Sequence, residues 1–233
     1  MSNSQQKDKP LLNLLFSIVI PAIILSKFST PDRLGVLPGF LIALAFPIGI
    51  SIYQLIIQRK IGFIAILGFV SILLTGMIGI FEIPTQYLAI KEAAVPLLIG
   101  IAVFVSQYTK YPLIEKIIYN PELLHIEKIE NSLQVNQQTE ALKKYMRHAT
   151  YMVTASFLLS AVLNYLLTKH IVVSPAGTEA FNQELGKLTA LSYPAIALPS
   201  TLVVLFALWY LIRGLSKATG LSLEDMLNPN LNK

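Results

Sequence analysis

Long apolar stretches alternate with short polar segments along the whole chain. Six stretches approach or exceed the roughly 20 residues that a helix needs to cross the hydrocarbon core of a bilayer. They are residues 11–26, 36–57, 61–81, 87–108, 150–167 and 188–212. We therefore predict an all-α polytopic membrane protein, a six-transmembrane-helix bundle in which residues 1–233 form a single membrane domain.

The segment between the fourth and fifth stretches, residues 112–148, is more polar and is expected to be a linker with a short amphipathic helix. Asn120 suits the start of that helix. Apolar residues then recur on one face, at Leu123, Ile126, Ile129 and Leu133. A second helix is expected from about Thr139 into the fifth stretch. Residues 168–187 are expected to form a polar loop.

The tail carries signals of its own. Gly220 suits a helix end, Ser222 with Asp225 resembles a capping box, and Leu221 is placed to contact Met226. These residues predict one further helical turn after the last apolar stretch.

The first stretch has two interpretations. Lys7 and Lys9 precede it, as in a secretory signal peptide, but residues 26–28 offer no small-x-small cleavage site. A first transmembrane helix, kinked at Pro21, is therefore favoured. At the start of the second stretch, Gly35 and Gly39 lie four residues apart, a spacing that lets helices pack closely and permits a homodimer.

Composition supports the membrane assignment and narrows the chemistry. Hydrophobic residues make up 54% of the chain and charged residues 13%, too little polar surface for a soluble protein of this size. There is no cysteine, the three histidines are dispersed, and no HExxH, P-loop, GxGxxG or GxSxG motif is present. We expect no metal, no cofactor and no enzymatic activity.

The distribution of lysine and arginine predicts the orientation. With six spans and a cytoplasmic N-terminus, thirteen of these residues fall in inner segments and four in outer ones. Such a bias places both termini, and the linker 112–148, in the cytoplasm. The basic residues adjoin apolar stretches, so we expect them to face anionic lipid headgroups of the bilayer rather than nucleic acid.

Lys91 and Glu92 lie within the fourth stretch, about one turn below the predicted outer surface, and Pro96 follows one turn later. Adjacent helical residues point about 100° apart, which predicts that the two charges have separate partners. In one interpretation Lys91 reaches the outer headgroups while Glu92 faces a polar spot in the bundle. In the other, Glu92 is an intramembrane proton or cation site beside a helix break at Pro96.

The inner end of the fourth stretch carries the most specific pattern. Val105-Ser106-Gln107-Tyr108, then Lys110, then Pro112-Leu113-Ile114-Glu115-Lys116, resembles the corresponding segment of the intracellular septation protein A family. Lys91, Phe157 with Asn164, and the segments 181–182 and 188–191 are similar to that family as well. The resemblance covers roughly residues 60–215. This chain departs from the family in its longer linker, its proline-rich first two spans and the lack of a tryptophan-rich start to the fifth span.

The resemblance implies an inner-membrane protein of the bacterial cell envelope that acts through partner proteins in septation or envelope maintenance. It brings no catalytic residues with it. From the residues themselves, Lys110 and Lys116 are placed to hold the helix end at anionic lipid, and Pro112 to turn the chain into the interface. These three residues are either a membrane anchor or a docking surface for other envelope membrane proteins. The alternative function is a small-solute or ion transporter or channel that uses Glu92.

Overall fold

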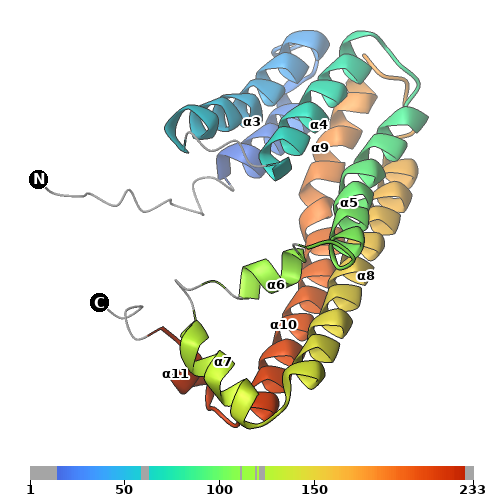
Figure 1. The fold of residues 1–233 in the computed structure, drawn as a ribbon. Helices are drawn as coiled ribbons and strands as arrows, with labels where there is room; N and C mark the ends of the chain where they lie inside the picture. Colours follow the sequence, from blue (N-terminus) through green and yellow to red (C-terminus); the bar gives the residue numbers. More distant parts are fainter. Residues whose placement is uncertain (1–14, 59–62, 111, 119, 121–123, 229–233) are drawn as a thin grey trace, which may run out of the picture. The chain divides into compact units, whose positions relative to one another are not determined.

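A computed structural model describes residues 15–58, 63–110, 112–118, 120 and 124–228. Apart from one isolated bridge between Leu124 and Leu227, the regular elements among these residues are helical (Figure 1). The predicted all-α fold is confirmed. The elements are η1 (Leu15–Val19), α2 (Ile20–Ile23), η2 (Ile24–Phe28), α3 (Val36–Gln58), α4 (Phe63–Ile80), α5 (Gln86–Ser106), α6 (Leu113–Ile118), α7 (Ile126–Val135), α8 (Thr139–Ile171), α9 (Glu179–Ser192), η3 (Tyr193–Ala197), α10 (Leu198–Thr219) and α11 (Leu223–Met226).

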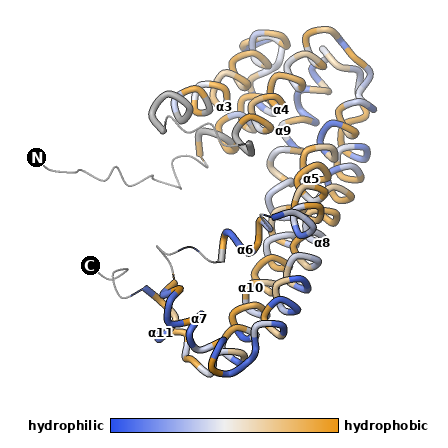
Figure 2. Tube along the Cα trace, viewed as in Figure 1, coloured by the Kyte–Doolittle hydropathy of each residue, from blue (hydrophilic) through white to orange (hydrophobic). Residues whose placement is uncertain are grey.

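Three described helices are long and apolar enough to cross a membrane. They are α5, α8 and the continuous run Glu179–Thr219, which joins α9, η3 and α10. Val36–Ile50 and Ile66–Ile80 are shorter apolar helices, and Figure 2 shows the hydrophobic residues along α4. The count of six spans stays a prediction. Four basic residues that flank the predicted spans lie outside the described residues. Lys7 and Lys9 precede the first span, and Arg59 and Lys60 lie between the second and third.

The chain divides into two compact units. The first contains Met1–Val95 and Ala161–Ile196, and the second contains Pro96–Ser160 and Ala197–Lys233. Helices α5 and α8 each contribute one part to each unit.

The core of the first unit forms where α3, α4, α5 and α9 meet. Phe181 and Leu88 are fully buried there, and Phe40 is almost so. Gly79 faces the Phe40 ring, and a Cβ on Gly39 would lie 2.9 Å from the Ser29 backbone. The close packing predicted at Gly39 thus occurs within the chain. The other member of the glycine pair, Gly35, has a different role, because its positive φ of 85° lies in the turn before α3.

Two prolines lie in or beside wide, π-helical turns. Pro194 lies within η3, and Pro21 lies in α2 between η1 and η2. Proline lacks the N–H that an α-helix requires, and a π-turn is one way in which a helix accommodates that loss while continuing. Pro21 therefore alters this helical run without ending it.

The second unit is built around a core in which α7 packs against α8 and α10. Ile129 and Leu133 of α7 are buried with Leu142 of α8 and Leu211 of α10. The predicted amphipathic helix exists and lies against other helices, but it begins later than expected. Residue 120 precedes it as an irregular residue, and His125 caps α7 by accepting a hydrogen bond from the Lys128 N–H.

The tail follows its sequence signals. Gly220 ends α10 with a φ of 72°, and the Ser222 side chain caps α11. Met226 is buried, and Leu221 packs on the same core. The predicted capping box and final helical turn are confirmed.

The predicted polar loop 168–187 is wrong over much of its length. Helix α8 continues to Ile171, and α9 begins at Glu179, where Thr178 accepts a hydrogen bond from the Phe181 N–H. The intervening turn is held by Glu184, whose carboxylate accepts hydrogen bonds from the Val173 and Ser174 N–H groups at 2.9 Å. The polar residues on one side of α9 concealed its helical periodicity, while Phe181, Leu185 and Leu188 on the other side are buried.

Candidate functional site

A buried cation joins α4 to α5 within the first unit. Lys91 on α5 is only 9% exposed, and its Nζ lies 2.6 Å from Thr75 Oγ1, 3.2 Å from Ser71 Oγ and 3.3 Å from the Ser71 carbonyl oxygen. Ser71 and Thr75 are four residues apart, so they lie on the same face of α4. One turn of α4 therefore offers three acceptor oxygens to the same ammonium group.

Glu92 completes the set of acceptors around Lys91. Its Oε1 lies 2.6 Å from Lys91 Nζ. An ammonium has three N–H donors, and here Thr75, Ser71 and Glu92 supply an acceptor for each. The positive charge is thus paired and fully hydrogen-bonded, which offsets the large cost of removing it from water.

The contact with Glu92 corrects the predicted separation of the two charges. The Cβ atoms of adjacent helical residues do diverge, but the long Lys91 side chain brings its tip back to the side on which the Glu92 carboxylate lies. The interpretation in which Lys91 reaches the outer headgroups is also wrong, because the ammonium is turned toward α4. Glu92 keeps 29% of its side chain exposed, so the pair is closed on the lysine side and open on the carboxylate side.

Pro96 stands one turn after Glu92, inside α5. Because proline has no N–H, the Glu92 backbone carbonyl loses the hydrogen bond that residue 96 would otherwise donate. The Glu92 carbonyl is therefore an acceptor without its usual helical donor.

The predicted surface residues lie at the end of α5 and in α6. Lys110 and Lys116 are exposed, and Pro112 is half-buried where α6 begins, its carbonyl accepting a hydrogen bond from the Lys116 N–H at 3.0 Å. The turn before α6 is fixed by Ser106, whose hydroxyl accepts a hydrogen bond from the Leu113 N–H at 3.1 Å. These three residues belong to the second unit, whereas Lys91 and Glu92 belong to the first.

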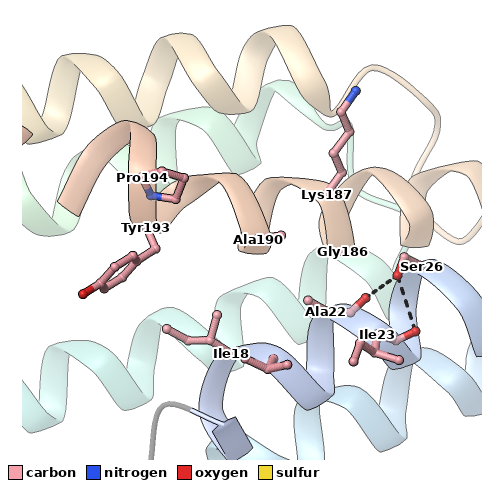
Figure 3. Close-up of a pocket in the computed structure, with 10 residues that line it drawn as sticks. Ile18, Ala22, Ile23, Ser26, Gly186, Lys187, Ala190, Tyr193 and Pro194 are labelled. Carbon is pink, nitrogen blue, oxygen red and sulfur yellow. Dashed lines mark hydrogen bonds between the residues drawn. The ribbon is translucent and has the colours of Figure 1, made fainter. Parts of the chain in front are cut away.

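An apolar groove of about 460 Å³ lies in the first unit between the helical run at residues 18–26 and α9. Figure 3 shows Ile18 and Ala22 facing Ala190 across it, while the Lys187 side chain points away from them. The groove is lined mostly by apolar side chains and offers few hydrogen-bonding groups to a polar ligand.

Sequence reasoning identified Lys91 and Glu92 but missed Ser71. Thr75 on α4 forms a hydrogen bond between helices, because its hydroxyl accepts from Lys91 on α5. The available signal for Ser71 was its i, i+4 spacing from Thr75 in an otherwise apolar helix. Among the described residues, no group of His, Asp and Glu side chains is arranged to hold a metal ion.

Comparison with known proteins returned no matching family model, no matching curated protein and no matching solved structure.

Proposed function

We propose that this chain is a six-span inner-membrane protein of the bacterial cell envelope, with cytoplasmic termini, that acts without catalysis through partner proteins. The proposal rests on the apolar helices, on the lysine and arginine bias toward one side, and on the resemblance at residues 105–116 to the intracellular septation protein A family. Septation or envelope maintenance is the role that this resemblance implies.

The observation that supports a non-transporting role is that the Lys91 ammonium has all its hydrogen-bond donors satisfied. Its ammonium has an acceptor for every N–H and a carboxylate for its charge. A side chain bound so completely is suited to fixing α4 against α5, whereas a carrier site must release its ion or proton during each cycle. We therefore assign the cluster to structural support of the bundle.

The partner surface in this proposal is the segment from Lys110 to Lys116. Helix α6 directs Ile114 toward the core of the second unit but leaves Leu113 at 39% and Ile117 at 60% exposure. Exposed apolar residues close to two lysines suit an anionic membrane surface or the juxtamembrane part of another envelope protein.

Charge reversal tests this surface. The double variant Lys110→Glu with Lys116→Glu should lower the recovery of crosslinked partners from intact cells severalfold. The matched control, Lys169→Glu with Lys187→Glu, reverses two cations on the predicted outer side and should leave recovery unchanged. An unaltered crosslinking profile in the first variant, at equal expression, would argue against docking at this segment.

A transporter or channel is the second candidate, and the partial exposure of Glu92 is what favours it. A partly exposed carboxylate in an apolar helix has the chemistry of a proton or cation site. If the chain conducts protons or cations, purified protein in liposomes should show flux that Glu92→Gln abolishes. Absence of flux from the unaltered protein, at verified incorporation, supports the scaffold role instead.

A further inference from the structure

A second, more polar pocket lies within the second unit. Its volume is about 450 Å³, within the range of small-molecule sites. The residues after α5 and the start of α6 form one wall, and the first turns of α8 form the other. Its polar lining includes Gln107, Glu115, Lys143 and Arg147, with the rings of Tyr108 and Tyr151.

Gln107 has unmet hydrogen-bonding capacity at this pocket. Both polar atoms of its amide, Oε1 and Nε2, are buried, and neither has a hydrogen-bond partner among the described residues. Buried amides in folded proteins are nearly always paired, so an orphaned one that lines a polar cavity points to a missing ligand group. Its NH₂ can donate to that group.

Arg147 supplies a cation at the same pocket. Within the described residues its guanidinium makes no ion pair, whereas Lys143, one turn earlier on the same face of α8, is paired with Glu140 at 2.8 Å. A guanidinium offers two parallel N–H donors that match the oxygens of phosphate or carboxylate. Among the described residues, the pocket therefore holds a guanidinium without an ion pair and an amide without a hydrogen bond.

The remaining wall residues restrict the ligand further. Phe104 contacts the rings of both Tyr108 and Tyr151, with centroids 5.6 Å and 6.1 Å apart, which fixes this side of the pocket. Glu115 also lines the pocket, and when ionised it can accept a hydrogen bond from a ligand donor such as a hydroxyl or ammonium.

We propose that this pocket binds a phosphate ester that bears a hydroxyl or ammonium group near the phosphate. Arg147 pairs with two phosphate oxygens, the Gln107 amide donates to the phosphate, and Glu115 accepts from the neighbouring hydroxyl or ammonium. This chemistry is shared by soluble sugar or polyol phosphates and by phospholipid headgroups. The inference uses residues of the second unit alone and does not depend on the role proposed for Lys91.

The test uses the full chain in micelles of dodecyl maltoside, a detergent that carries no phosphate. One arm adds soluble glycerol 1-phosphate, with glycerol as the probe that lacks phosphate, and measures affinity by calorimetry. The other arm adds phosphatidylglycerol to the micelles and counts retained lipids by native mass spectrometry. Arg147→Gln should weaken binding by about tenfold, and Gln107→Leu by a smaller factor, because a charge-assisted hydrogen bond is worth more than a neutral one.

The matched control is Arg213→Gln, the same substitution at an arginine of the second unit that lies over Trp209 rather than at the pocket. It should bind like the unaltered protein. Binding in the soluble arm alone identifies a free phosphate ester, and binding in the lipid arm alone identifies a headgroup; either supports the pocket. Equal binding by Arg147→Gln and Arg213→Gln, or no phosphate-dependent binding in either arm, overturns it. If Arg147→Gln fails to fold, Arg147→Lys keeps the charge, removes the paired donors and should weaken binding in the same way.

Discussion

At the scale of single residues, Lys91 shows how a costly charge is made compatible with an apolar helix. The charge is visible in the sequence. Its partners Ser71 and Thr75 could not be predicted, because they lie on another helix. The angle of about 100° between adjacent helical side chains did not predict the Lys91–Glu92 ion pair. That angle describes the directions in which the side chains leave the backbone, whereas the four-carbon lysine chain can bring its ammonium back toward the carboxylate.

The Lys91 cluster predicts a non-additive pair of substitutions. Lys91→Met leaves the Glu92 carboxylate without its cation, and Glu92→Gln leaves the ammonium with neutral acceptors only. We expect each to lower the free energy of unfolding by about 1–3 kcal/mol, and the double variant to cost less than the sum, because it leaves no unpaired charge. Thermal unfolding in detergent measures this, with Lys187→Met as a control at an exposed lysine. Strictly additive losses would show that the two charges do not stabilise one another.

Gly186 predicts a second effect at residue scale. A Cβ at this position would lie 2.8 Å from the Ala22 carbonyl oxygen and 3.0 Å from the Ser26 nitrogen, both backbone atoms. Gly186→Ala should therefore force α9 away from the first helical run and cost about 1–3 kcal/mol. No described atom lies within 4 Å of a Cβ at Gly49, so Gly49→Ala should be neutral or stabilise by up to about 1 kcal/mol through helix propensity. Similar melting temperatures for the two variants would contradict the close approach.

At the scale of elements, the sequence predicted the helix ends that depend on contacts between residues close together in the chain. The Gly220 helix end and the Ser222 cap were predictable because each is a contact within a few residues. Helix α9 was missed because its stability depends on burying Phe181 and Asn182, and Asn182 donates to Ser29 Oγ at 3.0 Å and to the Val36 carbonyl at 2.8 Å. Partners about 150 residues away in sequence leave no local pattern.

The element α11 carries a pH-dependent contact. Lys128, followed by the Ser222 hydroxyl, lowers the pKa of the Asp225 carboxyl from 3.8 to about 2. The ionised carboxylate thus favours the docked tail, and this contribution is full above about pH 4 and is lost as the pH falls toward 2. Asp225→Asn should mimic that loss at neutral pH.

Hydrogen exchange measures the Asp225 effect at the His125 amide, which donates to the Met226 carbonyl at 2.9 Å. Asp225→Asn should speed its exchange at pH 7. The control Glu224→Gln removes an exposed charge next to Asp225 but outside its contacts with Lys128 and Ser222. Equal exchange in the two variants would show that the ion pair does not hold the tail.

At the scale of the whole molecule, apolar length was the strongest signal in the chain. It identified α5, α8 and α10 as long hydrophobic helices because hydrocarbon requires both continuous apolarity and internal backbone hydrogen bonding. The helix expected from about Thr139 into the fifth stretch is confirmed, because α8 begins at Thr139 and runs for 33 residues. Its length of about 50 Å exceeds the hydrocarbon thickness. The polar first turns of such a helix must project beyond the lipid. They include the wall of the Arg147 pocket, which sequence reasoning missed because its members come from separate segments.

Orientation gives the last prediction, and the chain is well suited to testing it because its sequence contains no cysteine. A cysteine introduced at exposed Gln138, before α8, should be shielded from a membrane-impermeant maleimide added to intact spheroplasts and should react after lysis. A cysteine at exposed Asp32, in the predicted first outer loop, should react before lysis. The reason is the excess of lysine and arginine in the segments that include Lys143 and Arg147, since translocating those charges is disfavoured. Labelling of Gln138→Cys in intact spheroplasts would show that the topology is the reverse of the predicted one. The Lys110–Lys116 surface and the pocket lined by Arg147 would then lie on the outer face.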